Sequence, residues 1–194
     1  MLVRHAKKGN GNPIDEDEMN GGSKNLLSRI GEIASNSLKL PKCMSNVVRV
    51  GGSEFSRSVM TAIRIANGNG FDPLIIGSNP YLASQSDFAW FNANWGRVKE
   101  EMAQNGGVEI SACRKLMSSE MIANIEKGLT MTIAEYVLWK GDIILGTHSP
   151  WIQFAIEMLT KEPVNYDVAE LGYIVIAEPA TIVATNIPEL CIKV

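Results

Sequence analysis

Long apolar stretches and a surplus of basic residues are both missing from this 194-residue chain. No apolar run reaches the roughly 20 residues that a membrane-spanning helix needs. The first residues have no charged-then-apolar leader, so we expect no secretory signal, and we expect the natural start to lie a few residues upstream. The formal net charge of −3 gives no general attraction to nucleic acid or to anionic membranes. We therefore expect neither partner, and any anion site must be built locally.

Cysteine and histidine are also scarce. The three cysteines, Cys43, Cys113 and Cys191, are odd in number, far apart and without metal-ligand spacing. Free thiols in a reducing compartment are the better interpretation, which predicts a cytoplasmic protein. We expect no metal and no other cofactor. Histidine occurs only twice, as His5 and His148.

The rest of the composition is that of an ordinary globular protein, with 45% apolar and 20% charged residues. This length suits one domain with a sizeable core, which we expect to span residues 1–194. Apolar periodicity predicts strands at residues 2–6, 47–50 and 73–77, separated by amphipathic helices at residues 26–38 and 55–66. This alternation of strands and helices is the mark of a parallel sheet covered by helices.

The last third of the chain predicts three more strands. The strand at residues 142–147 precedes a helix that we expect to open at Ser149-Pro150, with the serine as N-cap. Residues 171–177 and 180–184 are joined by a tight turn, which predicts an antiparallel pair. The predicted fold is an α/β three-layer sandwich, with a mostly parallel central sheet, helices on both faces and an antiparallel edge strand.

Two stretches interrupt this rhythm. Residues 7–24 are rich in glycine, asparagine and acidic residues and predict a loop, whose acidic run at residues 15–18 we interpret as solvated surface. Residues 80–140 predict a helical insert or cap, with one helix starting at Ser118 and another, by a capping box, at Thr132. This insert has an aromatic face that consists of Phe88, Phe91 and Trp95. The face is a small core of its own, a lid that shapes a substrate pocket, or both at once.

Both histidines stand where an expected parallel strand ends. Arg4 and His5 close the first strand, and His148 closes the strand at residues 142–147. Arg57 falls in the first turn of the helix that follows the second strand. Because α/β folds place their ligands at the carboxyl ends of parallel strands, we expect two imidazoles, two guanidiniums and a helix N-terminus to converge there. A phosphoryl group fits such a site best, and a neutral imidazole can attack its phosphorus.

Three motifs, in order, also resemble signatures of the histidine phosphatase superfamily, the phosphoglycerate mutase-like proteins. Leu-Val-Arg-His-Ala at residues 2–6 is similar to the family's Arg-His-Gly/Ala motif. Residues 53–62, Ser-Glu-Phe-Ser-Arg-Ser-Val-Met-Thr-Ala, are similar to its Ser-x-x-x-Arg-(Ala/Ser)-x-x-Thr-Ala stretch. Gly-Thr-His-Ser-Pro at residues 146–150 resembles the second-histidine motif. The matches span nearly the whole chain apart from residues 80–140.

The resemblance implies a role for each matching residue. His5 would be the nucleophile that accepts the phosphoryl group. Its equatorial oxygens would be held by Arg4, Arg57 and His148. Further phosphate contacts would come from Asn10 or Asn12 and from Ser149. The alternative for the two arginines and the second histidine is a structural role as buried ion-pair partners.

One feature of many family members is missing, namely a glutamate after the third strand that protonates the departing oxygen. The corresponding residues 82–87, Leu-Ala-Ser-Gln-Ser-Asp, contain none. Asp87 is the nearest acid, and it is either the proton donor or a cap at a helix start. An alkyl alcohol leaves poorly without a proton, so the missing glutamate favours a phosphohistidine, acyl phosphate or phosphoaryl substrate and argues against a mutase. The region from His148 onward also resembles the small bacterial phosphohistidine phosphatases.

The leading hypothesis is a metal-independent phosphatase that hydrolyses a phosphomonoester or phosphohistidine through a covalent phosphohistidine on His5. Its partner would be a small phosphorylated substrate or a phosphoprotein. The alternative is a degenerate, non-catalytic member of the same fold that binds phosphate or phosphoproteins. A third class, a Rossmann-type nucleotide binder, is suggested only by Gly51-Gly52 after a strand, since the spaced glycine fingerprint is absent.

Overall fold

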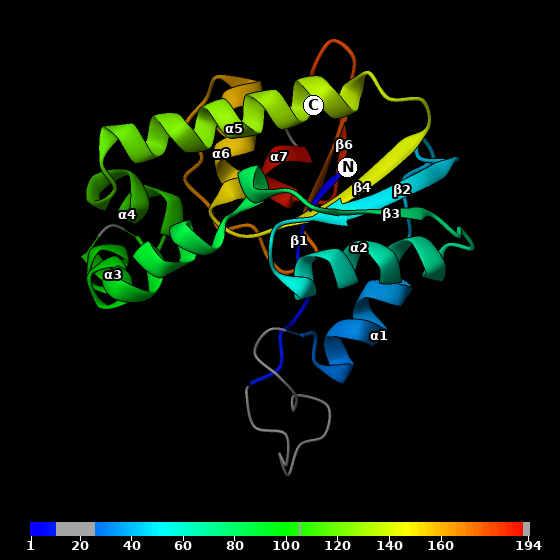
Figure 1. Ribbon diagram of the computed structural model, residues 1–194. Coiled ribbons are helices and arrows are strands. Elements are labelled where there is room, and N and C mark those ends of the chain that lie inside the picture. Colours follow the sequence, from blue (N-terminus) through cyan, green and yellow to red (C-terminus); the bar gives the residue numbers. More distant parts are fainter. Residues whose placement is uncertain (11–25, 105, 192–194) are drawn as a thin grey trace.

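The structure is a computed structural model that describes residues 1–10, 26–104 and 106–191. The acidic run at residues 15–18 and Asn12 lie outside the described residues. Within the described part, six strands form one sheet in the order β3-β2-β4-β1-β5-β6 (Figure 1). These strands are β1 (Leu2–Arg4), β2 (Val47–Gly52), β3 (Leu74–Ser78), β4 (Asp142–Thr147), β5 (Tyr173–Ala177) and β6 (Thr181–Thr185).

The sheet is mostly parallel, as predicted. β1, β2 and β3 run in the direction of β4, whereas β5 is antiparallel to both β1 and β6. Arg4 lies opposite Thr147, and Gly52 lies opposite Gly146. This register aligns the carboxyl ends of β1, β4 and β2, so the residues that follow these strands share one edge of the sheet.

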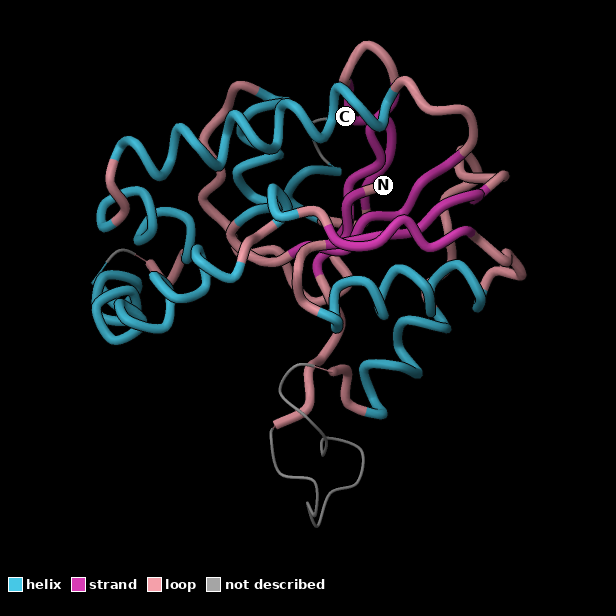
Figure 2. The backbone as a smooth tube through the Cα atoms, in the orientation of Figure 1, coloured by secondary structure: helices cyan, strands magenta, loops and turns pink. Residues whose placement is uncertain are grey.

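Helices cover both faces of the sheet and complete the predicted three layers. One face carries α1 (Arg29–Ser37) and α2 (Ser56–Gly68), and the other carries α5 (Ser119–Val137), α6 (Trp151–Thr160) and α7 (Pro188–Cys191) (Figures 1 and 2). Successive residues of β4 serve the two layers in turn. Ile144 packs in the cluster with Ile65 of α2, while Leu145 packs in the cluster with Phe154 of α6. This alternation is the period of two that a strand buried on both faces requires.

The described residues between 80 and 140 are mostly helical, as predicted. They form the short 3₁₀ helix η1 (Pro80–Leu82), then α3 (Gln85–Gln104), α4 (Glu109–Leu116) and α5. In Figures 1 and 2, α3 and α4 lie to one side of the sheet, away from α1 and α2. Ile110 and Leu129 of these helices belong to the same apolar cluster as Trp151 and Phe154 of α6. The insert and the central layer therefore share buried apolar surface.

One predicted helix start, at Thr132, and one predicted N-cap, at Ser149, are wrong. No helix begins at Thr132, because α5 runs through it, and the buried Thr132 Oγ1 accepts a hydrogen bond from Asn79 Nδ2 at 3.2 Å. The predicted start at Ser118 is confirmed, since its side chain accepts from the backbone N–H of Met121. Ser149 is not the N-cap of α6, because Pro150 takes that position and the Ser149 hydroxyl donates to Gln153 Oε1.

The structure shows the exposure of two cysteines and the lengths of the apolar helices. Cys43 is exposed and Cys113 is buried, and both carry free thiols. Burial raises the pKa of the Cys113 thiol well above its usual value. Among the described helices, none combines the length and the apolar character that crossing a membrane would require.

Candidate active site

The two histidines meet at the carboxyl ends of β1 and β4. Their ring centroids are 4.7 Å apart and their planes are inclined by 63°. His5 is 9% exposed and His148 is 2% exposed. The backbone N–H of His5 donates to the carbonyl of Thr147 at 2.9 Å, which continues the parallel pairing by one residue. The structure thus brings together the imidazoles that the sequence predicts to converge.

The His5 ring is held as a neutral imidazole with one nitrogen available. Its Nδ1 lies 2.6 Å from the carbonyl oxygen of Ala6. Because a carbonyl only accepts, Nδ1 carries the proton and Nε2 keeps its lone pair. Burial, with a smaller contribution from the nearby Arg57, Arg4 and Lys8, lowers the pKa of His5 to about 3. The ring is therefore uncharged at neutral pH, as a nitrogen nucleophile must be.

His148 is oriented by two serines. Its Nε2 lies 2.8 Å from both Ser53 Oγ and Ser58 Oγ, and its Nδ1 lies 3.4 Å from Nη2 of Arg57. A guanidinium only donates, so Nδ1 accepts and the ring proton is on Nε2. Burial and the proximity of His5 lower the pKa of His148 well below its usual value. Both serines fall in the second family-like motif, but nothing in the sequence marked them as partners of this histidine.

Arg57 enters the site from the first turn of α2, as predicted. It is only 5% exposed, and its guanidinium lies 4.7 Å from the ring centre of Phe55 and 5.3 Å from that of Phe88. Burial lowers the pKa of Arg57 to about 10, so the side chain stays charged at neutral pH. The Thr61 hydroxyl donates to the Arg57 carbonyl and accepts from the N–H of Ala6, which ties α2 to the end of β1.

Arg4 supplies a second guanidinium from the last position of β1. Its Nη1 donates to the carbonyl of Val168, which precedes β5. Its Nε is buried and has no hydrogen-bond partner among the described residues. A buried donor without an acceptor is unfavourable, and an anion bound in front of the two histidines would satisfy it.

Aromatic rings from the insert close one side of the site. The Phe88 ring lies 4.8 Å from that of His148 and stacks on Trp151 at 5.8 Å. Phe55 lies 5.2 Å from His148 and 4.1 Å from Phe88. Phe91 also packs on Trp151. Of the two predicted roles for this aromatic face, the contacts favour a wall beside the site over a separate core.

Three other predicted site residues lie elsewhere or are engaged. Asp87 and Ser84 form a capping box at the start of α3, because Asp87 Oδ2 accepts from the N–H of Ser84 while Ser84 Oγ accepts from the N–H of Asp87. This favours capping over proton donation for Asp87. Asn10 is exposed at the border of residues 11–25, and its contact with phosphate stays a prediction. The Ser149 hydroxyl donates to Gln153.

Glu109, at the start of α4, is a candidate that sequence reasoning missed. Ser149 and the guanidinium of Arg4 act on its carboxyl in the opposite sense to burial, because both favour the charged form and lower its pKa. Its backbone N–H donates to Asp167 Oδ1 at 3.1 Å. Burial above all, and the Asp167 carboxylate, raise the pKa of Glu109. No motif surrounds this glutamate, so only the fold reveals that it reaches the catalytic edge.

Two cavities differ in their relation to this cluster. One of about 460 Å³ lies beside the aromatic wall, bounded by Asp87, Trp90 and Trp151. Another, of about 320 Å³, lies at the opposite ends of the strands, next to Leu2 and Asp142, and is too remote for the strand-end chemistry. Within residues 1–10, 26–104 and 106–191, no group of three or more His, Cys, Asp or Glu is arranged to hold a metal ion.

Comparison with known proteins identifies the fold. No family model and no curated protein matches the sequence. Among solved structures, YhfR of Bacillus stearothermophilus superposes with a TM-score of 0.53 at 10% identity, over 96% of this chain and 94% of that chain. A phosphoserine phosphatase of Entamoeba histolytica, solved with 3-phosphoglyceric acid, gives a TM-score of 0.52 at 14% identity, over 95% and 94%. The chain therefore has the phosphoglycerate mutase-like fold that its motifs predict.

Proposed function

We propose that this protein is a metal-independent phosphatase that hydrolyses a phosphomonoester or phosphohistidine through a covalent phosphohistidine on His5. The observation that carries the proposal is the state of the His5 ring. Its Nδ1–H is held by the Ala6 carbonyl, so the lone pair of Nε2 is available beside two guanidiniums and a second imidazole. A structural histidine would not require cationic neighbours that disfavour its own protonation.

The arginines and His148 would bind the phosphoryl oxygens. Nε of Arg4, buried and without a hydrogen-bond partner among the described residues, would be one donor to the bound phosphoryl group. Arg57 stays charged and its guanidinium is confined between two aromatic rings, which limits the entropy lost on binding. His148 lies beside the His5 ring, and because its Nδ1 accepts from Arg57 in this structure, it would donate to a phosphoryl oxygen from that nitrogen only after protonation. Fixed donors in a buried site stabilise the charge that spreads over the phosphoryl oxygens in the transition state.

Two chemical steps complete the turnover. His5 Nε2 attacks phosphorus and forms a P–N bond. The bond from phosphorus to the leaving atom breaks, which is oxygen in a phosphomonoester and nitrogen in a phosphohistidine. The leaving atom takes the electron pair and then a proton from solvent water. Water then attacks the phosphohistidine, the P–N bond breaks and inorganic phosphate leaves. Splitting the reaction in this way replaces one difficult displacement by two easier ones.

The experiment is phosphate release from p-nitrophenyl phosphate by the wild-type protein and His5→Ala. We expect the variant to lose activity by a factor of about 10³ or more, because the covalent route is removed, while its circular dichroism stays unchanged. With labelled substrate and a rapid quench, the wild type should carry an acid-labile, alkali-stable phosphoryl group that the variant lacks. EDTA should leave the rate unchanged. Equal turnover by both proteins would refute the proposal.

A non-catalytic phosphate or phosphoprotein binder is the second candidate. The observation in its favour is that Asp87, the acid nearest the family position, is engaged in capping α3, so it is not placed as a proton donor. Calorimetry with inorganic phosphate and phosphopeptides, run beside a release assay over sugar phosphates, nucleotides and phosphohistidine proteins, separates the two. Binding without release supports this candidate, and release from any substrate that requires His5 excludes it.

A further inference from the structure

One buried polar side chain close to the two histidines has no part in the chemical steps proposed above, namely Gln153, the third residue of α6. It is fully buried (0% exposed), and the other buried residues of α6 are all apolar. Burying an amide costs free energy unless its polar atoms find hydrogen-bond partners. Because an apolar side chain would fill the same space without that cost, an amide at this position needs a reason other than packing.

The Gln153 amide joins two segments of the chain. Its Nε2 donates to the carbonyl of Tyr166 at 2.9 Å and to Oδ1 of Asp167 at 3.4 Å. Its Oε1 accepts from the Ser149 hydroxyl at 2.5 Å. This arrangement needs a group that donates to one segment and accepts from the other. An amide meets that requirement, whereas a carboxylate only accepts and an apolar side chain does neither.

Both segments lead directly to a residue of the proposed phosphate site. Ser149 follows His148 in the sequence. Residues 166–167 precede Val168, which is buried and whose carbonyl accepts from Nη1 of Arg4. The Nε of the same guanidinium is buried and has no hydrogen-bond partner among the described residues. The direction in which Arg4 presents that donor therefore depends on where Val168 lies.

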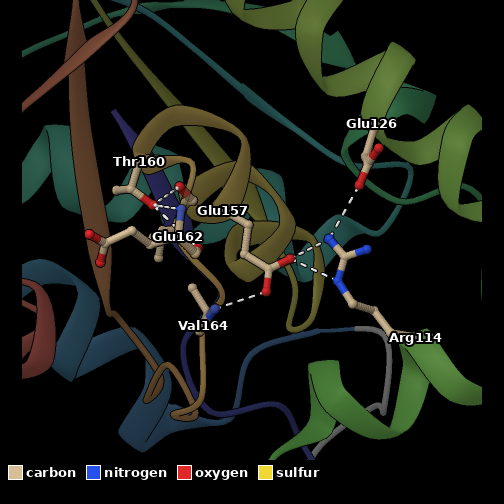
Figure 3. Close-up of polar contacts among 7 residues, drawn as sticks. Arg114, Glu126, Glu157, Thr160, Glu162 and Val164 are labelled. Carbon is tan, nitrogen blue, oxygen red and sulfur yellow. Dashed lines mark hydrogen bonds and ion pairs between the residues drawn. The ribbon is translucent and has the colours of Figure 1, made fainter.

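The loop that carries this carbonyl, residues 161–168, contains no helix or strand, so its position depends on side-chain contacts. Figure 3 shows its first part, where Glu157 Oε1 of α6 accepts from the N–H of Val164 at 2.8 Å. The other oxygen of this carboxylate, Oε2, accepts from Arg114 of α4. Gln153 lies one helical turn before Glu157 and holds the later part of the loop, which is the part nearest the phosphate site.

We propose that Gln153 is a positioning residue of the phosphate site, which holds the carbonyl of Val168, and therefore the guanidinium of Arg4, in a fixed place relative to His148. This inference rests on the function proposed above. Donors that are already aimed at the phosphoryl oxygens need no reorganisation during the reaction, and a displacement of about 1 Å can cost about 100-fold in rate. Gln153 itself touches neither the substrate nor the reacting atoms.

The test is a double-mutant cycle between Gln153 and Arg4, measured as kcat/KM for p-nitrophenyl phosphate. Gln153→Met removes both sides of the amide contact and should lower kcat/KM by about 10- to 100-fold. In a protein that already carries Arg4→Ala, the same substitution should lower kcat/KM less than about threefold, because no guanidinium is left to position. A merely structural defect would cost the same factor with and without Arg4, so equal factors in the two backgrounds would overturn the proposal.

Glu157→Gln is the matched control, because it changes another α6 side chain that contacts the same loop, one turn farther from the phosphate site. It should change kcat/KM by the same factor in both backgrounds. If it depends on Arg4 as strongly as Gln153→Met does, the loop as a whole, and not Gln153, positions the guanidinium. We expect Gln153→Met to fold, since Val168 stays in the apolar core and Asp167 keeps the N–H of Glu109, and urea unfolding checks this.

Gln153→Glu gives a second measurement that remains usable if Gln153→Met does not fold. A protonated carboxyl both donates and accepts, as the amide does, whereas a carboxylate only accepts and would face the Asp167 carboxylate. The kcat/KM of this variant relative to the wild type should therefore be highest at acid pH and decrease as the pH rises. A ratio that does not change with pH contradicts the proposal. Undiminished phosphate release by His5→Ala refutes the parent proposal instead.

Discussion

Acid should destabilise the folded protein through His5, because the folded state resists protonation that the unfolded chain accepts. The folded pKa of this histidine is about 3, against 6.5 for the free side chain. Above pH 6.5 the ring is neutral in both states and its burial carries no electrostatic penalty. Between these two values the unfolded chain binds a proton that the folded state excludes, so the free energy of unfolding decreases as the pH falls.

The size of the effect follows from the difference between the two pKa values. At pH 5 the pH is about 1.5 units below the pKa of His5 in the unfolded chain, and each unit corresponds to about 1.4 kcal/mol. Protonation of His5 in the unfolded state should therefore lower the free energy of unfolding by about 2 kcal/mol. The ring is buried and its neighbours Arg4 and Arg57 are cations, and these effects outweigh the bond to the Ala6 carbonyl, which favours the imidazolium. Such a loss is a large part of the stability of an ordinary domain.

The assay is urea unfolding at pH 7.5 and pH 5 in phosphate-free buffer, with the wild type and His5→Gln. Glutamine keeps a polar side chain of similar size and does not titrate. All other groups, His148 included, are present in both proteins, so the wild type should lose about 2 kcal/mol more than the variant between the two pH values. Equal losses would mean that His5 has one pKa in both states, and the buried, neutral nucleophile would have to be abandoned.

Four further substitutions test the geometry of the cluster. Ser53→Ala or Ser58→Ala alone leaves His148 Nε2 one hydrogen-bond partner and should lower kcat/KM only slightly. The double variant removes both partners and should lower kcat/KM by about 10- to 100-fold, because an unsatisfied buried polar group costs about 1–3 kcal/mol. If the effect of the double variant is only the sum of the two single effects, this interpretation is wrong. Arg57→Lys keeps the charge but loses the planar fork, so phosphate affinity by calorimetry should fall about tenfold or more, and unchanged affinity would remove it from the site. Gly146→Ala would place a Cβ 2.0 Å from the carbonyl oxygen of Ser58, and urea unfolding should show a loss of about 3 kcal/mol; a native-like midpoint would show that α2 and β4 are not in this register.

The sequence could predict the site residues that lie at the ends of strands. Apolar runs that stop at Arg4-His5 and at His148 predicted both the parallel strands and the edge at which their last residues meet, because register follows from which residues are buried. The aromatic face of α3 was also readable, but not whether it served a separate core or the site. That choice depended on Trp151, which receives Phe88 and Phe91 from a distant segment.

Local signatures failed where a longer pattern overrode them. Thr132 and Glu135 match the sequence pattern of a capping box, yet both lie inside α5. The helical spacing of apolar residues that starts at Ile125 continues past them, and burial of those residues against the core outweighs a local cap. Ser149 before a proline likewise resembles an N-cap, but its hydroxyl is engaged by Gln153 one turn into α6. Sequence shows that a capping group is available, and only packing shows whether it is used.

The missing glutamate illustrates the same difference between position in the sequence and position in space. A leaving group needs a protonated carboxyl at a point near the His5–His148 pair, and any element that passes this sheet edge can supply it. Here α4 reaches that edge from within the insert, held by Arg114 at one end and Asp167 at the other. The absence of the family glutamate is therefore a weak reason to restrict the substrates. An acid can come from another helix, at a sequence position that no motif marks. Phosphate release from an alkyl ester and from p-nitrophenyl phosphate, measured side by side, should therefore decide the substrate class, and the absent motif residue alone should not.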